Sequence, residues 1–321
     1  MDWKKLLPVI GIILLAYILW VFNLEKIISV FSTLNLLYAA LCFFSIPIFL
    51  VLFNIEWQLI LKQQSIHVSF TYSLKNYLIG YFYGFITPGG FGSFLRALYL
   101  KHESKAPLPK CVSNIITSNT VDYITLFSLA SVGGLLLVGQ YPYLFVFILL
   151  LLLTVTLAFI FFLRQKSSKR LFQRLLRTQI FQIIQQYMDD PIESFYEDLP
   201  GFKSLLLPFL LSFFNWFVFY TELYLIAQLF NIHIPYITFI FLLAIASTIA
   251  TIPVSIYGLG TRDATLVALL SLYGVSPENS ISFTLFWFTV FLITPSIIGG
   301  FITIMENKKL PSRKKPIKLL S

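Results

Sequence analysis

The sequence predicts an all-α polytopic membrane protein. Of its 321 residues, 58% are hydrophobic and only 12% are charged, whereas soluble domains carry roughly 25% charged residues. Apolar runs long enough to cross a bilayer as helices recur along the chain, and two shorter apolar stretches are interrupted by Gly- and Pro-containing motifs. These observations indicate about six full transmembrane helices plus two broken, re-entrant hairpins arranged as an inverted repeat.

The apolar runs of about 20 residues predict the full spans. They cover residues 6–22, 36–53, 111–138, 144–163, 205–230 and 281–304. The first run is long and leads into Asn23-Leu24-Glu25 with no small-residue cleavage pattern. We therefore interpret it as a retained helix and not as a signal peptide.

The two interruptions read F-I-T-P-G-G-F-G-S-F-L-R at residues 85–96 and T-I-P-V-S-I-Y-G-L-G-T-R-D at residues 251–263. Backbone that leaves a helix at membrane depth persists only inside protein or beside a wet cavity, because hydrocarbon cannot satisfy its N–H and C=O groups. Each motif also carries an arginine, and an intramembrane ionisable residue indicates function. Paired broken segments are typical of transport sites. Ordinary interhelical turns between shorter spans are the open alternative.

The distribution of Lys and Arg predicts the topology. With Lys4 and Lys5 in the cytoplasm, residues 164–203 and the C-terminal tail also fall inside, provided that both broken units return to the side they entered from. Lys26 is then the only Lys or Arg in a predicted external loop. The same count opens the two hairpins to opposite sides of the membrane, which is the inverted repeat. We expect a multi-pass cell-membrane protein with both termini cytoplasmic.

This topology divides the chain into four parts. They are a first transmembrane half (1–163, hairpin near 76–100), a cytoplasmic amphipathic linker (164–203), a second half (204–306, hairpin near 236–273) and a basic cytoplasmic tail (307–321). Within the linker, residues 164–188 combine apolar positions at helical spacing with basic residues, so we expect a helix on the inner leaflet. A solvated loop that only sets topology is an equal alternative.

A polar stripe marks the helix predicted at 111–138. Asn114, Ser118, Asp122 and Thr125 are spaced three or four residues apart and share one face. An acid inside an apolar helix is functional by default, although Asp122 could instead neutralise a motif arginine for folding. Glu222, which shares a helix face with Asn215, is a weaker candidate because it could snorkel to the outer interface.

The interruptions also carry the elements of an anion site. Each has a Gly-x-Gly that we expect to precede a new helix, and helix N-termini attract anions with roughly half a positive charge. An arginine grips phosphate with two hydrogen bonds. The predicted substrate-binding residues are therefore Gly90, Gly92, Arg96, Gly258, Gly260 and Arg262, with Asp122 from the helix between them.

Other function classes find no support in the sequence. It contains no nucleotide-binding loop, nucleophile elbow or metalloprotease helix, so we expect no enzymatic activity and no cofactor. His67, His102 and His233 stand in separate loops, so no metal site is predicted, and Cys42 and Cys111 face opposite sides, so no disulfide is expected. The formal net charge of +9 resides mainly in loops, which fits membrane topology and not nucleic-acid binding.

The chain resembles the transmembrane region of lysylphosphatidylglycerol synthases and the flippase-like membrane proteins related to it. The resemblance rests on T-P-G-G-F-G-S-F-L-R-A-L-Y-L at 87–100, on Asp122, on I-P-V-S-I-Y-G-L-G-T-R-D at 252–263 and on Y-G-V-S at 273–276. The family often has Glu-Arg where this chain has Ser118-Asn119, and Glu at the position of Asp263, so Asp263 joins the candidate site. Lipid aminoacylation is not expected, because the sequence ends shortly after its last apolar run.

The resemblance implies translocation of an anionic lipid or a polyprenyl-phosphate-linked lipid between leaflets. Two other functions remain open. One is a non-transporting membrane subunit that binds an anionic lipid and presents it to a partner, such as a lipid-modifying or glycosyl-transfer enzyme. The other is a membrane-embedded lipid-modifying enzyme that uses Asp122 as a base. The identity of the lipid, the energy source and the oligomeric state are left open by the sequence.

Overall fold

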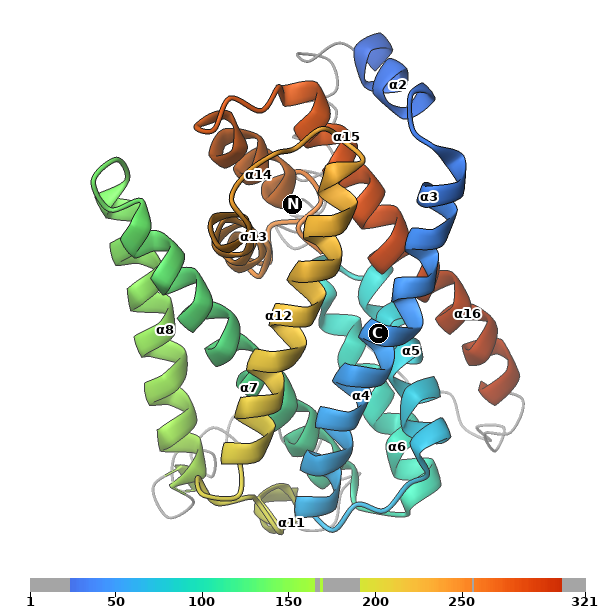
Figure 1. Cartoon of the computed structure of the whole chain (residues 1–321). Coiled ribbons are helices and arrows are strands. Elements are labelled where there is room, and N and C mark those ends of the chain that lie inside the picture. Colours follow the sequence, from blue (N-terminus) through green and yellow to red (C-terminus); the bar gives the residue numbers. More distant parts are fainter. Residues whose placement is uncertain (1–23, 165–167, 170–190, 256, 308–321) are drawn as a thin grey trace, which may run out of the picture.

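A computed structural model of the chain describes residues 24–164, 168–169, 191–255 and 257–307 (Figure 1). These residues form helices joined by turns, and no strand occurs among them, in agreement with the predicted all-α class. The apolar run predicted at 6–22, most of the amphipathic helix predicted within 164–188 and the basic tail from residue 308 lie outside the described residues.

The first half contains the helices up to residue 163. They are α2 (Leu24–Ser32), α3 (Leu36–Leu41), the 3₁₀ segment η1 (Cys42–Phe44), α4 (Ser45–Gln63), α5 (Phe70–Phe85), the 3₁₀ segment η2 (Pro88–Leu95), α6 (Arg96–Ser104), α7 (Leu108–Leu136) and α8 (Pro142–Leu163). Caps explain where several of them begin. The Asn35 side chain accepts hydrogen bonds from two N–H groups at the start of α3, and Ser69 accepts one at the start of α5, as N-cap residues do.

The second half follows the linker. Its helices are α11 (Pro191–Tyr196), α12 (Leu206–Gln228), α13 (Tyr236–Ala250), α14 (Thr261–Ser271), α15 (Pro277–Phe288), the π-helical turn η3 (Thr289–Ile293) and α16 (Thr294–Asn307). The Ser276 hydroxyl caps α15, and Pro277 stands in its first turn, where the missing proline N–H has no intrahelical partner to lose.

Within the described residues, four helices are long and apolar enough to cross a membrane. They are Leu36–Gln63, Pro142–Leu163, Leu206–Gln228 and Pro277–Glu306, and they confirm the spans predicted at 36–53, 144–163, 205–230 and 281–304. The first continues ten residues beyond the predicted end at 53. The run predicted at 111–138 lies in α7, a helix of 29 residues that is about 43 Å long at 1.5 Å per residue. The total of six spans stays a prediction.

The two interruptions separate pairs of shorter helices. The first pair is α5 and α6, which extends the predicted 76–100 to 70–104, and the second is α13 and α14, which matches the predicted 236–273. Each half has the same order, a long helix, a broken pair and another long helix. In Figure 1, α5 and α6 lie in the lower part of the molecule, whereas α13 and α14 lie in the upper part. The predicted inverted repeat requires this arrangement. The symmetry itself and re-entry into the membrane stay predictions.

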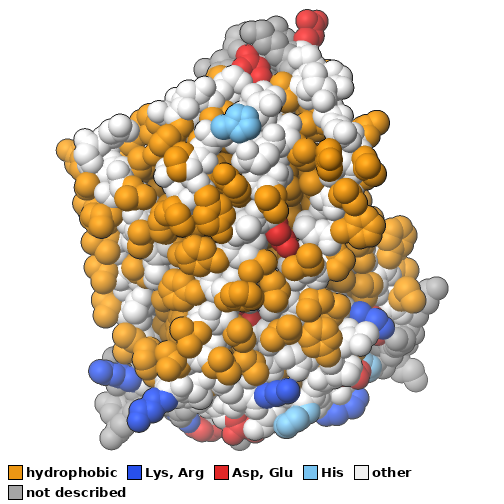
Figure 2. All heavy atoms as spheres, in the orientation of Figure 1, with side chains coloured by type: hydrophobic (Ala, Val, Ile, Leu, Met, Phe, Trp, Pro, Cys, Tyr) orange, Lys and Arg blue, Asp and Glu red, His pale blue; other side chains and the backbone are white. Residues whose placement is uncertain are grey.

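The surface carries a broad apolar belt. Figure 2 shows hydrophobic side chains covering the flank between the two ends, while Lys and Arg side chains gather at the lower end. Helix α8 is apolar throughout and largely exposed, with Tyr143, Leu150 and Leu157 on its outer surface. This distribution suits a membrane-embedded protein whose lower end faces the cytoplasm. The orientation of the termini stays a prediction.

Candidate functional site

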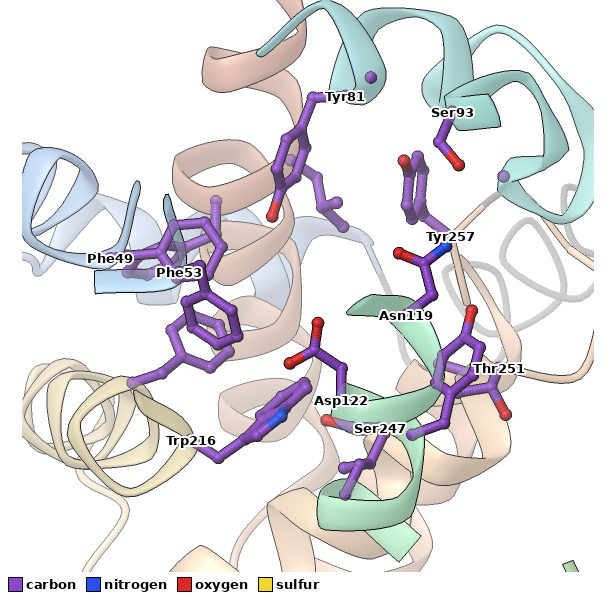
Figure 3. Close-up of a pocket in the computed structure, with 18 of the residues that line it drawn as sticks. Phe49, Phe53, Tyr81, Ser93, Asn119, Asp122, Trp216, Ser247, Thr251 and Tyr257 are labelled. Carbon is purple, nitrogen blue, oxygen red and sulfur yellow. The ribbon is translucent and has the colours of Figure 1, made fainter. Parts of the chain in front are cut away.

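A cavity of about 290 Å³ lies where the two interruptions meet the long helices α4, α7 and α12 (Figure 3). Arg96, Asp122 and Arg262 all line it, so the structure brings together charged residues that are distant in sequence. Much of the remaining wall is aromatic and comes from both halves: Phe49, Phe53, Trp216, Phe219, Trp287 and Phe291. The site is therefore an apolar chamber with a few polar groups, which is typical of small-molecule sites.

The second interruption contacts helix α5 of the first broken pair at this cavity. Tyr257 stacks on Tyr81 of α5, with ring centroids 6.3 Å apart and planes 13° apart. Gly84 makes room for the contact, because a Cβ at this position would collide with the Tyr257 hydroxyl. The second interruption therefore packs against the first broken helix pair, and both line the same cavity.

Arg96 is a buried cation that forms no ion pair with a carboxylate of the described residues. It begins α6, is 5% exposed and stacks over Trp57, with Cζ 4.5 Å from the ring centroid. Its Nη2 donates to Asn119 Oδ1 at 3.3 Å, while Nε has no hydrogen-bond partner among the described residues. No ion pair to a described carboxylate forms. The aromatic ring supports the cation but leaves its charge uncompensated.

Arg262 is held as an ion pair. Its Nη2 lies 3.0 Å from Asp263 Oδ1, and both side chains are nearly inaccessible to solvent. The guanidinium also lies over Trp287, with Cζ 4.2 Å from the ring centroid, and Nη2 approaches the Thr284 carbonyl oxygen at 3.4 Å. Although Arg262 lines the cavity, its charge is compensated within the protein.

Asp263 does two jobs at the start of α14. Its Oδ1 pairs with Arg262, and its Oδ2 accepts a hydrogen bond from the Gly260 N–H at 2.8 Å. A carboxylate at this position satisfies a free donor and opposes the positive end of the helix dipole. At this helix start, the protein's own carboxylate therefore occupies the Gly260 N–H, while the predicted anion-binding role of the helix start stays a prediction.

The N–H groups of three of the four predicted glycines already donate hydrogen bonds within the protein. Gly90 and Gly92 do not precede a helix but lie inside η2, and their N–H groups donate to the Thr87 carbonyl and hydroxyl oxygens at 3.2 and 2.7 Å. Gly258 and Gly260 do precede α14, yet the Gly260 N–H donates to Asp263. Several of these positions also have a steric requirement for glycine.

Two of these glycines show the steric requirement directly. Gly90 lines the cavity with a φ of 70°, a backbone conformation that L side chains rarely adopt. Gly258 has a φ of 78°, and a Cβ there would collide with Ala250. Both glycines allow the chain to turn sharply at the edge of the cavity.

Asp122 projects from α7 into the cavity beside Asn119 (Figure 3). Its Oδ1 accepts a hydrogen bond from Ser212 Oγ of α12 at 3.0 Å. It interacts electrostatically with Arg96 but forms no ion pair with either motif arginine. Asp122 therefore lies within electrostatic range of Arg96, but the structure shows no direct neutralisation of a motif arginine by Asp122.

Sequence reasoning missed Glu56. It lies on α4, is 1% exposed and interacts electrostatically with Asp122. Its Oε2 accepts a hydrogen bond from Asn215 Nδ2 at 2.8 Å, and its Oε1 has no partner among the described residues. The sequence feature that could have identified Glu56 is the apolar pattern from Trp57 to Leu61, because it continues the helix beyond the predicted end at residue 53.

The other predicted polar positions lie elsewhere. Asn114 is structural, because it bonds to the Trp57 indole and to Gln64. Glu222 lies outside the central cavity, in a groove between η1, α4 and α12, and its carboxylate oxygens have no partner among the described residues. Asn215 contacts Glu56 and not Glu222. In the described part of the chain, no group of three or more His, Cys, Asp or Glu side chains is arranged to hold a metal ion.

The fold and the cavity define a helical multi-pass membrane protein with a charged chamber between two broken helix pairs. The chain matches the family model of the lysylphosphatidylglycerol synthase TM region over residues 8–299 and belongs to this family, which confirms the predicted resemblance. A protein of Pyrococcus horikoshii described as UPF0104 membrane protein PH1989 is 22% identical over 333 residues. The alignment covers 96% of this chain and 98% of that protein.

Proposed function

We propose that this protein moves an anionic, phosphate-bearing lipid between the leaflets of the membrane and that Arg96 holds the phosphate. The observation that carries the proposal is the state of Arg96, a buried cation that lines a central cavity without an ion-pair partner among the described residues. A buried unpaired charge is unfavourable. An anionic head group would supply the missing partner, and a guanidinium is suited to phosphate.

The size of the cavity fits this role. At about 290 Å³ it is at the lower end of the range for small-molecule pockets. It suits a lipid head group, whereas the acyl or isoprenoid tails would stay outside among the membrane lipids. Membership of a lipid-related membrane family agrees with such a substrate.

The arrangement of the halves suits alternating access. The broken helix pairs lie toward opposite ends of the molecule in Figure 1, yet both reach the same cavity. Rocking of one half against the other around a fixed central site is how transporters with paired broken helices work. In this proposal Arg96 is the main phosphate ligand, and Arg262 contributes when its pair with Asp263 opens.

The test compares variants of Arg96 in liposomes. Translocation of a fluorescent phosphatidylglycerol is followed with a membrane-impermeant quencher, and its binding is measured in detergent. Loss of a charged hydrogen bond removes about 1.5–3 kcal/mol, so Arg96→Gln should weaken binding roughly tenfold or more and slow translocation. Arg96→Lys should restore only part of both, because a point charge replaces a two-pronged donor.

Lys62→Gln is the matched control, because it also removes one cation but from an exposed position at the end of α4. It should behave as the wild type. Wild-type binding and translocation in a folded Arg96→Gln protein would remove Arg96 from the mechanism. Binding without translocation by the wild type would favour the lipid-presenting subunit with an enzyme partner. A covalently altered lipid in the mass spectrum would favour an enzyme.

A further inference from the structure

Two carboxylates share the interior with Arg96, and neither has a basic partner within ion-pair distance in the described part of the chain. Glu56 is fully enclosed between α4 and α12, and Asp122 lines the cavity. The two acids interact electrostatically with each other, and Asp122 also interacts with Arg96. One cation therefore faces two acids in a place where uncompensated charge is strongly unfavourable.

Helix α12 donates a hydrogen bond to each of the two acids. Ser212 and Asn215 stand three residues apart, hence on the same face, and they donate to Asp122 and Glu56 respectively. Both donors are neutral, so they orient the carboxylates without supplying a positive charge. A purely structural ion pair would place a basic residue here, as Arg262 and Asp263 do in the second half.

The other described titratable groups at the cavity are four tyrosines and Arg262, whose charge is balanced by Asp263. Tyr77 and Tyr81 line the cavity from α5, Tyr123 from α7 and Tyr257 from the second interruption. Tyrosine hydroxyls are neutral at physiological pH. The charge of the site is therefore set by Arg96, Glu56 and Asp122.

The charge count of these three groups depends on protons. With both acids ionised the site carries −1, and with one proton shared between them it is neutral. A monoanionic head group at Arg96 returns the site to −1 unless a second proton enters. Because the site is buried, binding of the anion and binding of the proton favour each other.

Resting on the function proposed above, we propose that the anionic head group binds together with one proton, which Asp122 takes up from water at the open side of the cavity. The proton leaves from the same carboxylate when the head group leaves at the other side. Head group and proton therefore move in the same direction, and a proton gradient drives lipid translocation. Asp122 is the acceptor because its carboxylate lines the cavity, whereas Glu56 is enclosed.

Proton uptake can be measured on the wild-type protein alone. Calorimetric titration with a short-chain phosphatidylglycerol, in two buffers of different ionisation enthalpy at the same pH, should give uptake of about one proton per lipid. Affinity should fall by up to about tenfold per pH unit where the site is unprotonated before binding. In liposomes, lipid should accumulate away from the acidic side, and collapse of the gradient should abolish the accumulation.

Variants identify the acceptor. Asp122→Asn imitates the protonated acid, so its lipid affinity should not fall with rising pH and its proton uptake should vanish. Its translocation rate should be independent of the pH gradient. Asp198→Asn removes an exposed carboxylate that does not line the cavity, so this variant should keep wild-type proton uptake. Should Asp122→Asn fail to fold, the wild-type calorimetry still decides whether a proton is taken up with the lipid. Proton uptake that persists in Glu56→Gln would then leave Asp122 as the acceptor.

The outcomes separate the two proposals. Lipid binding and translocation with no proton uptake, at a rate that ignores the pH gradient, would overturn proton coupling and leave lipid translocation intact. An absence of lipid binding by the wild type would overturn both. Proton uptake that persists unchanged in folded Asp122→Asn would overturn the assignment to this residue.

Discussion

The two motif arginines carry their charge differently, although each follows a Gly-x-Gly. Arg262 has a carboxylate one residue away that also caps its helix, whereas Arg96 has an amide, Asn119, and an aromatic ring. A charge that is already paired contributes to stability, and an unpaired one is available to a ligand. We therefore expect Arg262 to matter first for folding and Arg96 first for binding.

Asp263→Asn should destabilise the protein strongly. The change leaves Arg262 buried without its counter-ion, and loss of one partner of a buried pair removes about 3–5 kcal/mol. Thermal unfolding in detergent is the measurement. Asp198→Asn is the control, because it also removes a carboxylate from a lysine contact, but Asp198 is 44% exposed and Lys110 keeps a second carboxylate, Glu197. No buried cation is left unpaired there, so we expect a smaller loss of stability. Equal stability of the two variants would contradict a structural role for the Asp263 pair.

At the scale of elements, the close approach of helices depends on small residues. A Cβ on Gly299 of α16 would collide with the Leu78 carbonyl oxygen of α5, and a Cβ on Gly133 of α7 would meet the Phe241 carbonyl oxygen of α13 at 2.8 Å. Helix association in lipid relies on such packing, because there is no hydrophobic driving force between helices there. The broken pairs are thus held at the cavity by backbone contacts that leave no room for a side chain.

Gly299→Ala should separate α16 from α5 and lower stability by about 1–3 kcal/mol, which is typical of overpacking. A backbone carbonyl, unlike the end of a flexible side chain, cannot move aside without shifting its helix. Gly139→Ala adds the same methyl group where no atom lies within 4 Å and should leave the unfolding temperature unchanged. A Gly299→Ala protein as stable as the Gly139→Ala control would show that the two helices are not packed this closely.

At the scale of the whole molecule, charge and hydropathy predict the orientation in the membrane. On the face shown in Figure 2, the apolar belt lies between two polar ends, and the visible Lys and Arg side chains gather at the lower one. The positive-inside rule places that end in the cytoplasm. The loop that precedes α15 then faces outside, and the linker region before α12 faces inside.

Single cysteines test this orientation after Cys42 and Cys111 have been replaced. Lys203→Cys and Tyr273→Cys occupy exposed positions, just before α12 and after α14. An impermeant thiol reagent added to intact cells should label position 273 and should label position 203 only after the membrane is opened. The reverse pattern would contradict the cytoplasmic placement of the linker, and access to both positions from the same side would contradict the opposite orientation of the two broken pairs.

The sequence by itself determined the all-α membrane class, four of the spans and both interruptions. It also identified the charged residues that line the cavity, Arg96, Asp122 and Arg262. Hydropathy and the high cost of intramembrane charge are local properties of the chain, so they can be read without the fold. Pairing is not local. Only the tertiary structure decided that Asp263 forms the ion pair with Arg262 and that Thr87 and Asp263 accept hydrogen bonds from glycine N–H groups. It also decided that Glu56 and Asp122 both accept hydrogen bonds from α12. Several residues could have met each of these partners, and the packing of helices far apart in sequence selected one.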